Sequence, residues 1–264
     1  MKKFNLLIIL LVVCLVMTGC KMSKKEIAEA KTDMTSYIKK NMGSNWTYAE
    51  DKVDIDDELN TKIKLFNVLD ESECVLESKS AYESLKANLP EKSYLSNVSI
   101  YCEFKDQKIG HANVKDLKKV NIDNLYSEAS FYGANDNKLT VNDEFFATQK
   151  KDFISKCQKY SYKEIFRNSD QYIGKHAVFK GKVFQVIDNG DMYDFIIEVN
   201  KDEYGFYEDS IYASIEKSYF NGRILDDDII TIYGKLNELH SYEAVSGQTI
   251  TIPSMYVRYA ELNK

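Results

Sequence analysis

The chain has 264 residues, 44% of them hydrophobic, with only 2 prolines and 11 glycines. This composition suffices for one large or two small packed domains and argues against a long disordered or collagen-like segment. Its 35 lysine and arginine residues face 41 aspartate and glutamate residues, a formal net charge of −6. A negative balance disfavours polyanionic partners, so we expect nucleic acid to be an unlikely ligand.

The first residues have the three-part layout of a secretory signal. A basic head at Lys2 and Lys3 precedes Leu6 to Met17, in which every residue is apolar. A bilayer-spanning helix needs about 20 apolar residues, which this run lacks. A helix that is apolar on all sides is seldom a surface helix of a soluble domain. We therefore expect a cleaved signal rather than a permanent membrane span or a core helix.

The end of this run, Met17-Thr18-Gly19-Cys20, resembles the lipobox of bacterial lipoproteins, whose usual pattern is Leu, a small residue, Gly or Ala, and Cys. Met17 stands where Leu is commonest. The resemblance implies that residues 1–19 are a lipoprotein signal peptide and that Cys20 becomes an acylated N-terminus, carrying fatty acids such as palmitate. Because each buried CH₂ contributes about 0.8 kcal/mol, two or more chains anchor a protein stably. We expect a cell-membrane lipoprotein on the extracytoplasmic face.

Residues 20–139 are predicted to form an α+β domain of a family that we do not recognise. Apolar residues recur at helical spacing in 23–43 and 78–90, so two helices are expected there, the second ended by Pro90. Segments 61–68 and 97–104 have the period of two that indicates strands, and the second returns after a turn at Asp106. Residues 140–160 are then predicted to form a helix that links two domains.

Five cysteines are present, and their pairing is left open by the sequence. Cys14 lies in the signal and Cys20 in the lipobox, which leaves Cys74, Cys102 and Cys157. Outside the cytoplasm Cys74 and Cys102 can form a disulfide. The alternative is that all three are buried free thiols.

Residues 161–264 have the pattern of a small β-barrel. Five segments with strand character follow one another, with a short helix expected between the third and the fourth. Gly181, inside the first of them, marks a bulge or a sharp bend of the kind that small closed barrels need. The segments span 176–187, 192–199, 210–215, 228–236 and 249–262. This order predicts an all-β, OB-like five-stranded barrel.

A set of motif residues opens the barrel region, namely Tyr162, Ile165, Arg167, Asn168, Asp170, Tyr172, Gly174, Lys175, Val178 or Phe179, Gly181, Lys182, Val183, Gln185 and Val186. In type and order these residues resemble the first motifs of the TcdC-like OB-fold domain family of Gram-positive bacteria. The stretches 223–236 and 246–255 resemble the family's later motifs. The family includes cell-surface lipoproteins and the membrane-bound regulator of a clostridial toxin operon, which has an uncleaved N-terminal segment in place of a lipobox. The resemblance therefore implies the OB fold and a cell-envelope setting.

No residue pattern in the sequence indicates a catalytic set, a metal site or a cofactor. The three histidines, His111, His176 and His240, occur singly, and no phosphate-binding loop or nucleophile motif is present. OB folds use aromatic side chains as stacking platforms. We therefore take four barrel tyrosines as candidate ligand-facing residues, namely Tyr193, Tyr212, Tyr233 and Tyr242.

Three functional hypotheses follow. The first is a non-enzymatic, membrane-anchored lipoprotein that binds a glycan, peptide or protein of the cell envelope. This hypothesis is consistent with the charge of the barrel region, since residues 160–264 hold 11 basic and 17 acidic side chains. This excess of negative charge would repel a phosphate backbone. The second is a membrane-held regulator similar to the toxin-operon protein. The third is an enzyme that uses carboxylates of the first domain.

Overall fold

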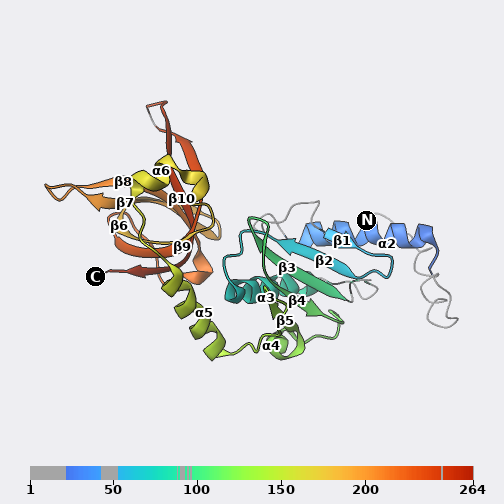
Figure 1. Cartoon of the computed structure of the whole chain (residues 1–264). Helices are drawn as coiled ribbons and strands as arrows, with labels where there is room; N and C mark the ends of the chain where they lie inside the picture. The colour runs from blue at the N-terminus through green and yellow to red at the C-terminus, as the bar shows by residue number, and fades with distance from the viewer. Residues whose placement is uncertain are drawn as a thin grey trace.

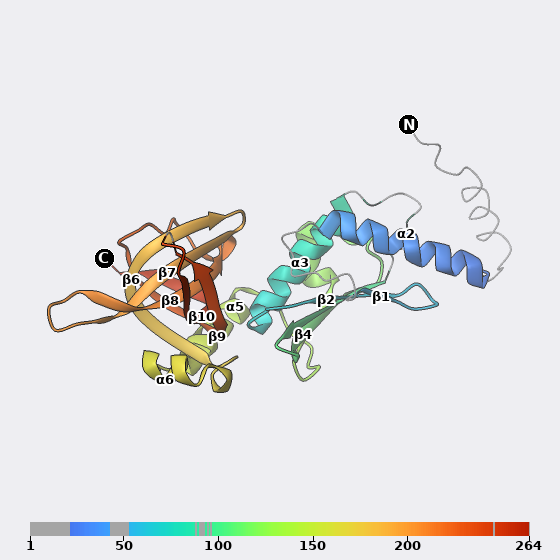
Figure 2. The same ribbon diagram turned by 90° about the horizontal axis from the view of Figure 1, so that it is seen from above.

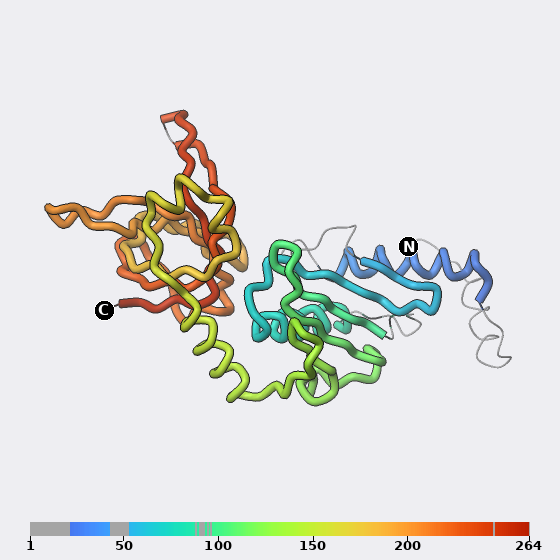
Figure 3. The backbone as a smooth tube through the Cα atoms, viewed as in Figure 1, coloured from blue at the N-terminus to red at the C-terminus, as the bar shows by residue number. Residues whose placement is uncertain are grey.

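Two separate folded parts make up the protein, which we describe from a computed structural model. It describes residues 22–42, 53–87, 89, 93, 95, 97–244 and 246–263. An α+β part built on one sheet comes first, and a closed β-barrel follows (Figure 1). Helix α5 (Asp143–Lys156) leads from one to the other, as the chain trace in Figure 3 shows. The prediction of an α+β domain followed by a five-stranded barrel is confirmed.

The N-terminal part is a five-stranded sheet in the order β1-β2-β3-β4-β5. Only β2 and β3 pair in parallel, and α3 is the crossover between them. Helices α2 and α3 lie side by side along one face of this sheet (Figure 2). The bounds are α2 (Lys24–Met42), β1 (Val53–Ile55), β2 (Thr61–Leu65), α3 (Glu71–Ala87), β3 (Val98–Phe104), β4 (Gln107–Val114), η2 (Ile122–Asn124), α4 (Leu125–Glu128) and β5 (Ser130–Gly133).

The core of this part follows the sequence periodicities. Every second residue of β3 is buried, and on α2 the buried residues recur every four positions. The structure joins Cys74 on α3 to Cys102 on β3 in a disulfide, with Cα atoms 5.6 Å apart. This is one of the two arrangements that the sequence left open. The bond ties the crossover helix to the central strand of the sheet.

Helix α3 begins at Glu71, seven residues before the predicted start at residue 78. Asp70 caps it, because its Oδ1 accepts a hydrogen bond from the Glu73 backbone N–H at 2.8 Å. The sequence patterns predict neither this cap nor the two additional turns that α3 has at its N-terminal end. The predicted helix ends at Gly43 and Pro90 lie outside the described residues.

The C-terminal part is a closed barrel with the strand order β10-β8-β7-β6-β9, in which β9 also pairs with β10. All pairs are antiparallel except β8 with β10, which gives the OB-like topology. The predicted short helix between the third and fourth strands is the single 3₁₀ turn η4. The bounds are α6 (Tyr162–Arg167), η3 (Ser169–Gln171), β6 (His176–Asn189), β7 (Met192–Lys201), β8 (Tyr207–Glu216), η4 (Lys217–Tyr219), β9 (Ile229–Glu243) and β10 (Thr249–Leu262).

Gly181 allows the barrel to close. A Cβ atom at this position would collide with the backbone carbonyl of Glu198 on β7. A bulge follows in the same strand, between Val183 and Gln185. The close approach and the bulge together bend β6 so that it pairs with β9 along its first half and with β7 along its second half.

Helix α5 is fixed at both ends. Its N-cap residue Asn142 accepts a hydrogen bond from the Phe145 N–H at 2.8 Å, and its last turn buries Phe153 against the barrel. The linker is thus packed against both parts rather than free between them. Within the described ranges, no helix has the length and apolar character needed to cross a membrane.

Candidate functional site

Two of the four predicted tyrosines lie together on the barrel surface, with a histidine between them. Tyr212 on β8 stacks on His240 of β9, with ring centroids 3.7 Å apart and planes 11° apart. His240 also stacks with Tyr242, at 6.3 Å and 25°. Strand β10 brings these rings together because it pairs with both β8 and β9. We call Tyr212, His240 and Tyr242 the ring row. It leads towards the β9–β10 hairpin, a position from which OB barrels contact ligands.

The other two predicted tyrosines have different surroundings. Tyr193 is only 8% exposed, because it alternates with Phe195 and Ile197 on the inner side of β7. Tyr233 packs against a cluster at the junction of the two domains. Neither belongs to the ring row, so the four tyrosines do not form one ligand-facing surface.

A hydrogen-bonded carboxylate lies next to the ring row. Asp194 of β7 is buried and accepts hydrogen bonds from Ser214 Oγ and, at 3.2 Å, from Asn189 Nδ2. Burial, together with the nearby Asp194 carboxylate, raises the pKa of Tyr212 to about 12. The Tyr212 hydroxyl therefore stays protonated and can donate a hydrogen bond at neutral pH. The ring row therefore carries an uncharged tyrosine hydroxyl beside its flat rings.

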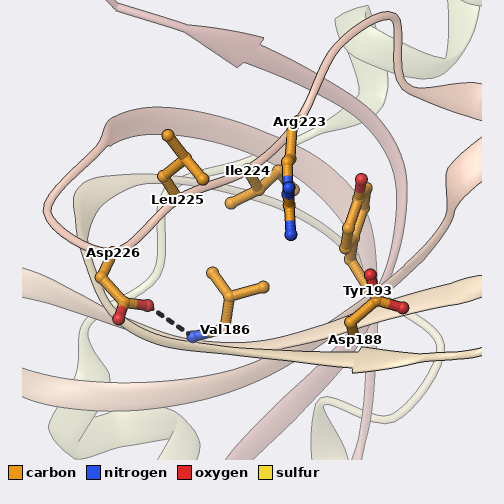
Figure 4. Close-up of a pocket in the computed structure, with 7 residues that line it drawn as sticks. All are labelled: Val186, Asp188, Tyr193, Arg223, Ile224, Leu225 and Asp226. Carbon is orange, nitrogen blue, oxygen red and sulfur yellow. Dashed lines mark hydrogen bonds between the residues drawn. The ribbon is translucent and has the colours of Figure 1, made fainter.

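A small pocket opens beside the β6–β7 hairpin (Figure 4). It measures about 210 Å³, and Val186, Ile224 and Leu225 supply most of its apolar wall. Arg223 projects into it, and among the described residues this guanidinium has no ion-pair partner. Asp226, at the rim, accepts a hydrogen bond from the Val186 N–H at 2.9 Å. Asp188 also lines the pocket, so its polar lining combines one guanidinium with two carboxylates.

The tip of the β7–β8 hairpin presents two exposed aromatic residues. Tyr204 is 78% and Phe206 72% exposed. Asp202 holds the tip in shape, because its Oδ1 accepts hydrogen bonds from the N–H groups of Tyr204 at 2.9 Å and Phe206 at 2.7 Å. Both rings are therefore presented from an ordered turn.

The N-terminal domain packs on the outer face of β9 and β10, and a buried ion pair joins the two domains there. Arg258 of β10 is 3% exposed; its Nε lies 3.2 Å from Asp70 Oδ2, and its Nη2 donates to Ser72 Oγ at 3.0 Å. Its guanidinium lies between the rings of Tyr219 and Tyr259, at 4.3 and 4.8 Å. Burial opposes the charge of Arg258, but Asp70 and Glu73 outweigh it and raise the pKa of the guanidinium.

Apolar contacts extend this interface. Phe104, at the end of β3, meets Tyr256 of β10 edge to face with centroids 6.3 Å apart. The ammonium group of Lys235 lies 4.7 Å from the centre of the Phe104 ring. At the rim, Lys105 Nζ lies 2.9 Å from Glu238 Oε1. The sequence patterns do not predict this interface, because its residues come from distant parts of the chain.

The other two histidines pack against aromatic rings. His111 stacks between Tyr101 and Tyr132, with centroids 5.2 and 4.5 Å away, and His176 packs on Phe153. In the part of the chain that the structure describes, no group of three or more His, Cys, Asp or Glu side chains is placed to hold a metal ion. Cys20 lies outside the described residues.

Comparison with known proteins gives likeness of fold only. No protein-family model matches the chain, and no curated protein matches it. Among solved structures, a mitochondrial single-stranded DNA binding protein of S. cerevisiae is 9% identical (TM-score 0.25) over 34% of this chain and 95% of that one. The N-terminal domain of PriB from Thermoanaerobacter tencongensis is 19% identical (TM-score 0.24), over 34% and 96%. An OBody bound to hen egg-white lysozyme is 14% identical (TM-score 0.27), over 40% and 94%.

Proposed function

We propose that the protein is a non-enzymatic lipoprotein, anchored through Cys20 on the extracytoplasmic face of the cell membrane, whose barrel binds a partner in the cell envelope. The observation that supports the binding role most is the ring row of Tyr212, His240 and Tyr242. Three aligned rings beside hydrogen-bond donors form the kind of platform that OB barrels offer to ligands. The lipobox resemblance at Cys20 supports the anchor.

The chemistry of the ring row favours a glycan, a peptide or a protein. Aromatic faces stack on the apolar face of a sugar or on another aromatic side chain. The barrel region has 11 basic and 17 acidic side chains, so a phosphate backbone would meet repulsion over most of its surface. An external location also limits contact with nucleic acid.

Loss of a ring tests the binding role. With soluble peptidoglycan fragments and cell-wall peptides as probes, Tyr212→Ala and Tyr242→Ala should each weaken binding by about 1 kcal/mol, or about fivefold, in calorimetric titrations. Tyr101→Ala is the matched control, because Tyr101 also stacks on a histidine but lies in the other domain. Equal affinities for all three variants would show that the ring row does not bind these ligands.

Metabolic labelling tests the anchor. Growth on a labelled fatty acid should label the wild-type protein and the Cys157→Ser control, and should leave Cys20→Ala unlabelled and released from the membrane fraction. A Cys20→Ala protein that is still acylated and still membrane-bound would refute anchoring at this residue.

One alternative has an observation in its favour. The stretch from Tyr162 to Ile187 resembles the family that includes the membrane-bound regulator of a clostridial toxin operon. A similar regulatory role would require an uncleaved N-terminus and a barrel in the cytoplasm. The two functions therefore differ in the side of the membrane on which the barrel lies.

A further inference from the structure

The pocket beside the β6–β7 hairpin rests on the hydrophobic core of the barrel. Its lining residues Tyr193 and Ile224 belong to the core cluster, and Val186 packs against that cluster. The volume of about 210 Å³ is below the roughly 300–1,000 Å³ of pockets for drug-sized molecules. Sites for small molecules combine apolar walls of this kind with a few placed polar groups. The pocket therefore has room for one small molecule with an apolar part, but not for an oligosaccharide.

Hydrogen bonds fix the loop of residues 223–228, which forms one wall of the pocket. The Asp227 N–H donates to the Val183 carbonyl oxygen at 2.8 Å, and the Val183 N–H donates to the Asp228 carbonyl oxygen, also at 2.8 Å. Within the loop, the Leu225 N–H donates to Asp228 Oδ2 at 2.8 Å. The loop is thus tied to β6, so this wall needs no rearrangement to bind a ligand.

Lys217 of η4 fixes the other wall of the pocket. Its ammonium group donates hydrogen bonds to Asp188 Oδ1 and to the Gly190 carbonyl oxygen, and it lies 5.0 Å from the centre of the Tyr193 ring. The charge of Asp188 is therefore matched by a cation of the protein itself. Asp188 gives the pocket polarity but no unmatched charge.

Two opposite charges remain on the lining, and they do not pair with each other. The guanidinium of Arg223 points into the pocket, and the carboxylate of Asp226 lies at the rim (Figure 4). None of the ion pairs among the described residues includes either side chain. The Val186 N–H donates to Asp226 Oδ1 at 2.9 Å, which leaves Oδ2 as a second acceptor. A purely anionic ligand would be repelled by Asp226 and a purely cationic one by Arg223, whereas a ligand with both charges satisfies both groups.

We propose that this pocket binds a free aliphatic α-amino acid in its zwitterionic form. The carboxylate of the ligand accepts hydrogen bonds from the Arg223 guanidinium, whose planar fork matches a carboxylate in two parallel bonds. The ammonium group donates to Asp226, and the aliphatic side chain packs on Val186, Ile224 and Leu225. This site goes beyond the proposed binding role of the ring row, with which it shares no residue.

Four probes, added to the full chain, separate the three contacts. Titration with L-leucine, followed by ligand-observed nuclear magnetic resonance, should show saturable binding. Leucinamide lacks the carboxylate, N-acetylleucine lacks the ammonium group and glycine lacks the side chain. Each of these should bind about tenfold or more weakly than leucine, because a charged hydrogen bond or a buried aliphatic side chain contributes at least that factor. No saturable binding of leucine, or a leucinamide affinity equal to that of leucine, would overturn the proposal.

Two variants assign the two charges to their residues. Arg223→Met should lose the preference for leucine over leucinamide but keep the preference for leucine over glycine. Asp226→Asn, whose amide oxygen can still accept the Val186 N–H, should lose the preference for leucine over N-acetylleucine. Arg167→Met and Asp227→Asn are the matched controls and should keep all wild-type preferences, because Arg167 is an exposed residue of α6 and Asp227 does not line the pocket.

Wild-type preferences in both Arg223→Met and Asp226→Asn would overturn the proposal. The variants leave the ring row unchanged, so the outcome is independent of the proposed binding function.

Discussion

Removal of the Arg258 side chain should uncouple the two domains. Arg258→Met keeps an apolar side chain of similar length but leaves Asp70 and Glu73 without the cation that faces them. Breaking a buried ion pair from one side costs about 3–5 kcal/mol, because the remaining charge stays buried and unpaired. The guanidinium also lies 4.3 Å from the Tyr219 ring centre, and that cation–π contact would be lost as well. Each domain has its own hydrophobic cluster, so the loss should appear in their coupling.

Urea unfolding, followed by circular dichroism and by tyrosine fluorescence, measures this coupling. For Arg258→Met we expect the first transition to move to lower urea by an amount that corresponds to about 3 kcal/mol or more, and the two probes to separate. Arg223→Met is the control, since Arg223 is exposed and substitution there should change stability by about 0.5 kcal/mol or less. An Arg258→Met protein that unfolds within about 1 kcal/mol of wild type would refute the assignment of this pair as the main polar link.

Three further expectations concern single features of the fold. Gly181→Ala should destabilise the barrel by about 1–3 kcal/mol in the same urea assay, because the alanine Cβ would collide with the Glu198 carbonyl. A variant as stable as the wild-type protein would contradict the close approach of β6 and β7 at this position. Replacing both Cys74 and Cys102 by Ala should lower the free energy of unfolding by about 3–4 kcal/mol, because the disulfide closes a loop across a sequence separation of 28. Thermal unfolding of the variant and the wild-type protein checks this value, and an unchanged melting temperature would contradict it. Burial raises the pKa of the Cys157 thiol to about 11, so at neutral pH iodoacetamide should alkylate this thiol far more slowly in the native protein than in the urea-unfolded protein. Mass spectrometry follows the alkylation, and equal rates would contradict the burial of Cys157.

Regular secondary structure could be predicted because its signals are local. The buried residues of β3 alternate along the sequence itself, and Gly181 marked the bent first strand of the barrel. The inward position of Tyr193 was also readable, since it alternates with Phe195 and Ile197. Faces of the later strands were harder to predict, because bulges between Ile252 and Ser254 and between Val257 and Tyr259 change which residues point outward.

The interface could not be predicted, since its partners are far apart in the sequence. Arg258 and Asp70 are separated by 188 positions, and Tyr219 and Glu77 by 142. In the sequence, Arg258 looks like an ordinary solvent-facing strand residue, and the carboxylates of α3 look like the polar side of a surface helix. Only the packing of the two domains shows that these charges are buried together. Two of the three residues of the ring row, Tyr212 and Tyr242, are among the predicted tyrosines, whereas the sequence shows His240 only as an isolated histidine.

The location of the barrel is the most direct test of the proposed function. Intact cells are treated with a protease that cannot cross the membrane, and an antibody against the barrel then follows the intact chain; a known cytoplasmic protein is the control for cell integrity. A lipid-anchored extracytoplasmic protein predicts loss of the intact chain while the cytoplasmic control survives. Survival of the full chain in intact cells, with digestion only after lysis, would place the barrel in the cytoplasm and contradict the account.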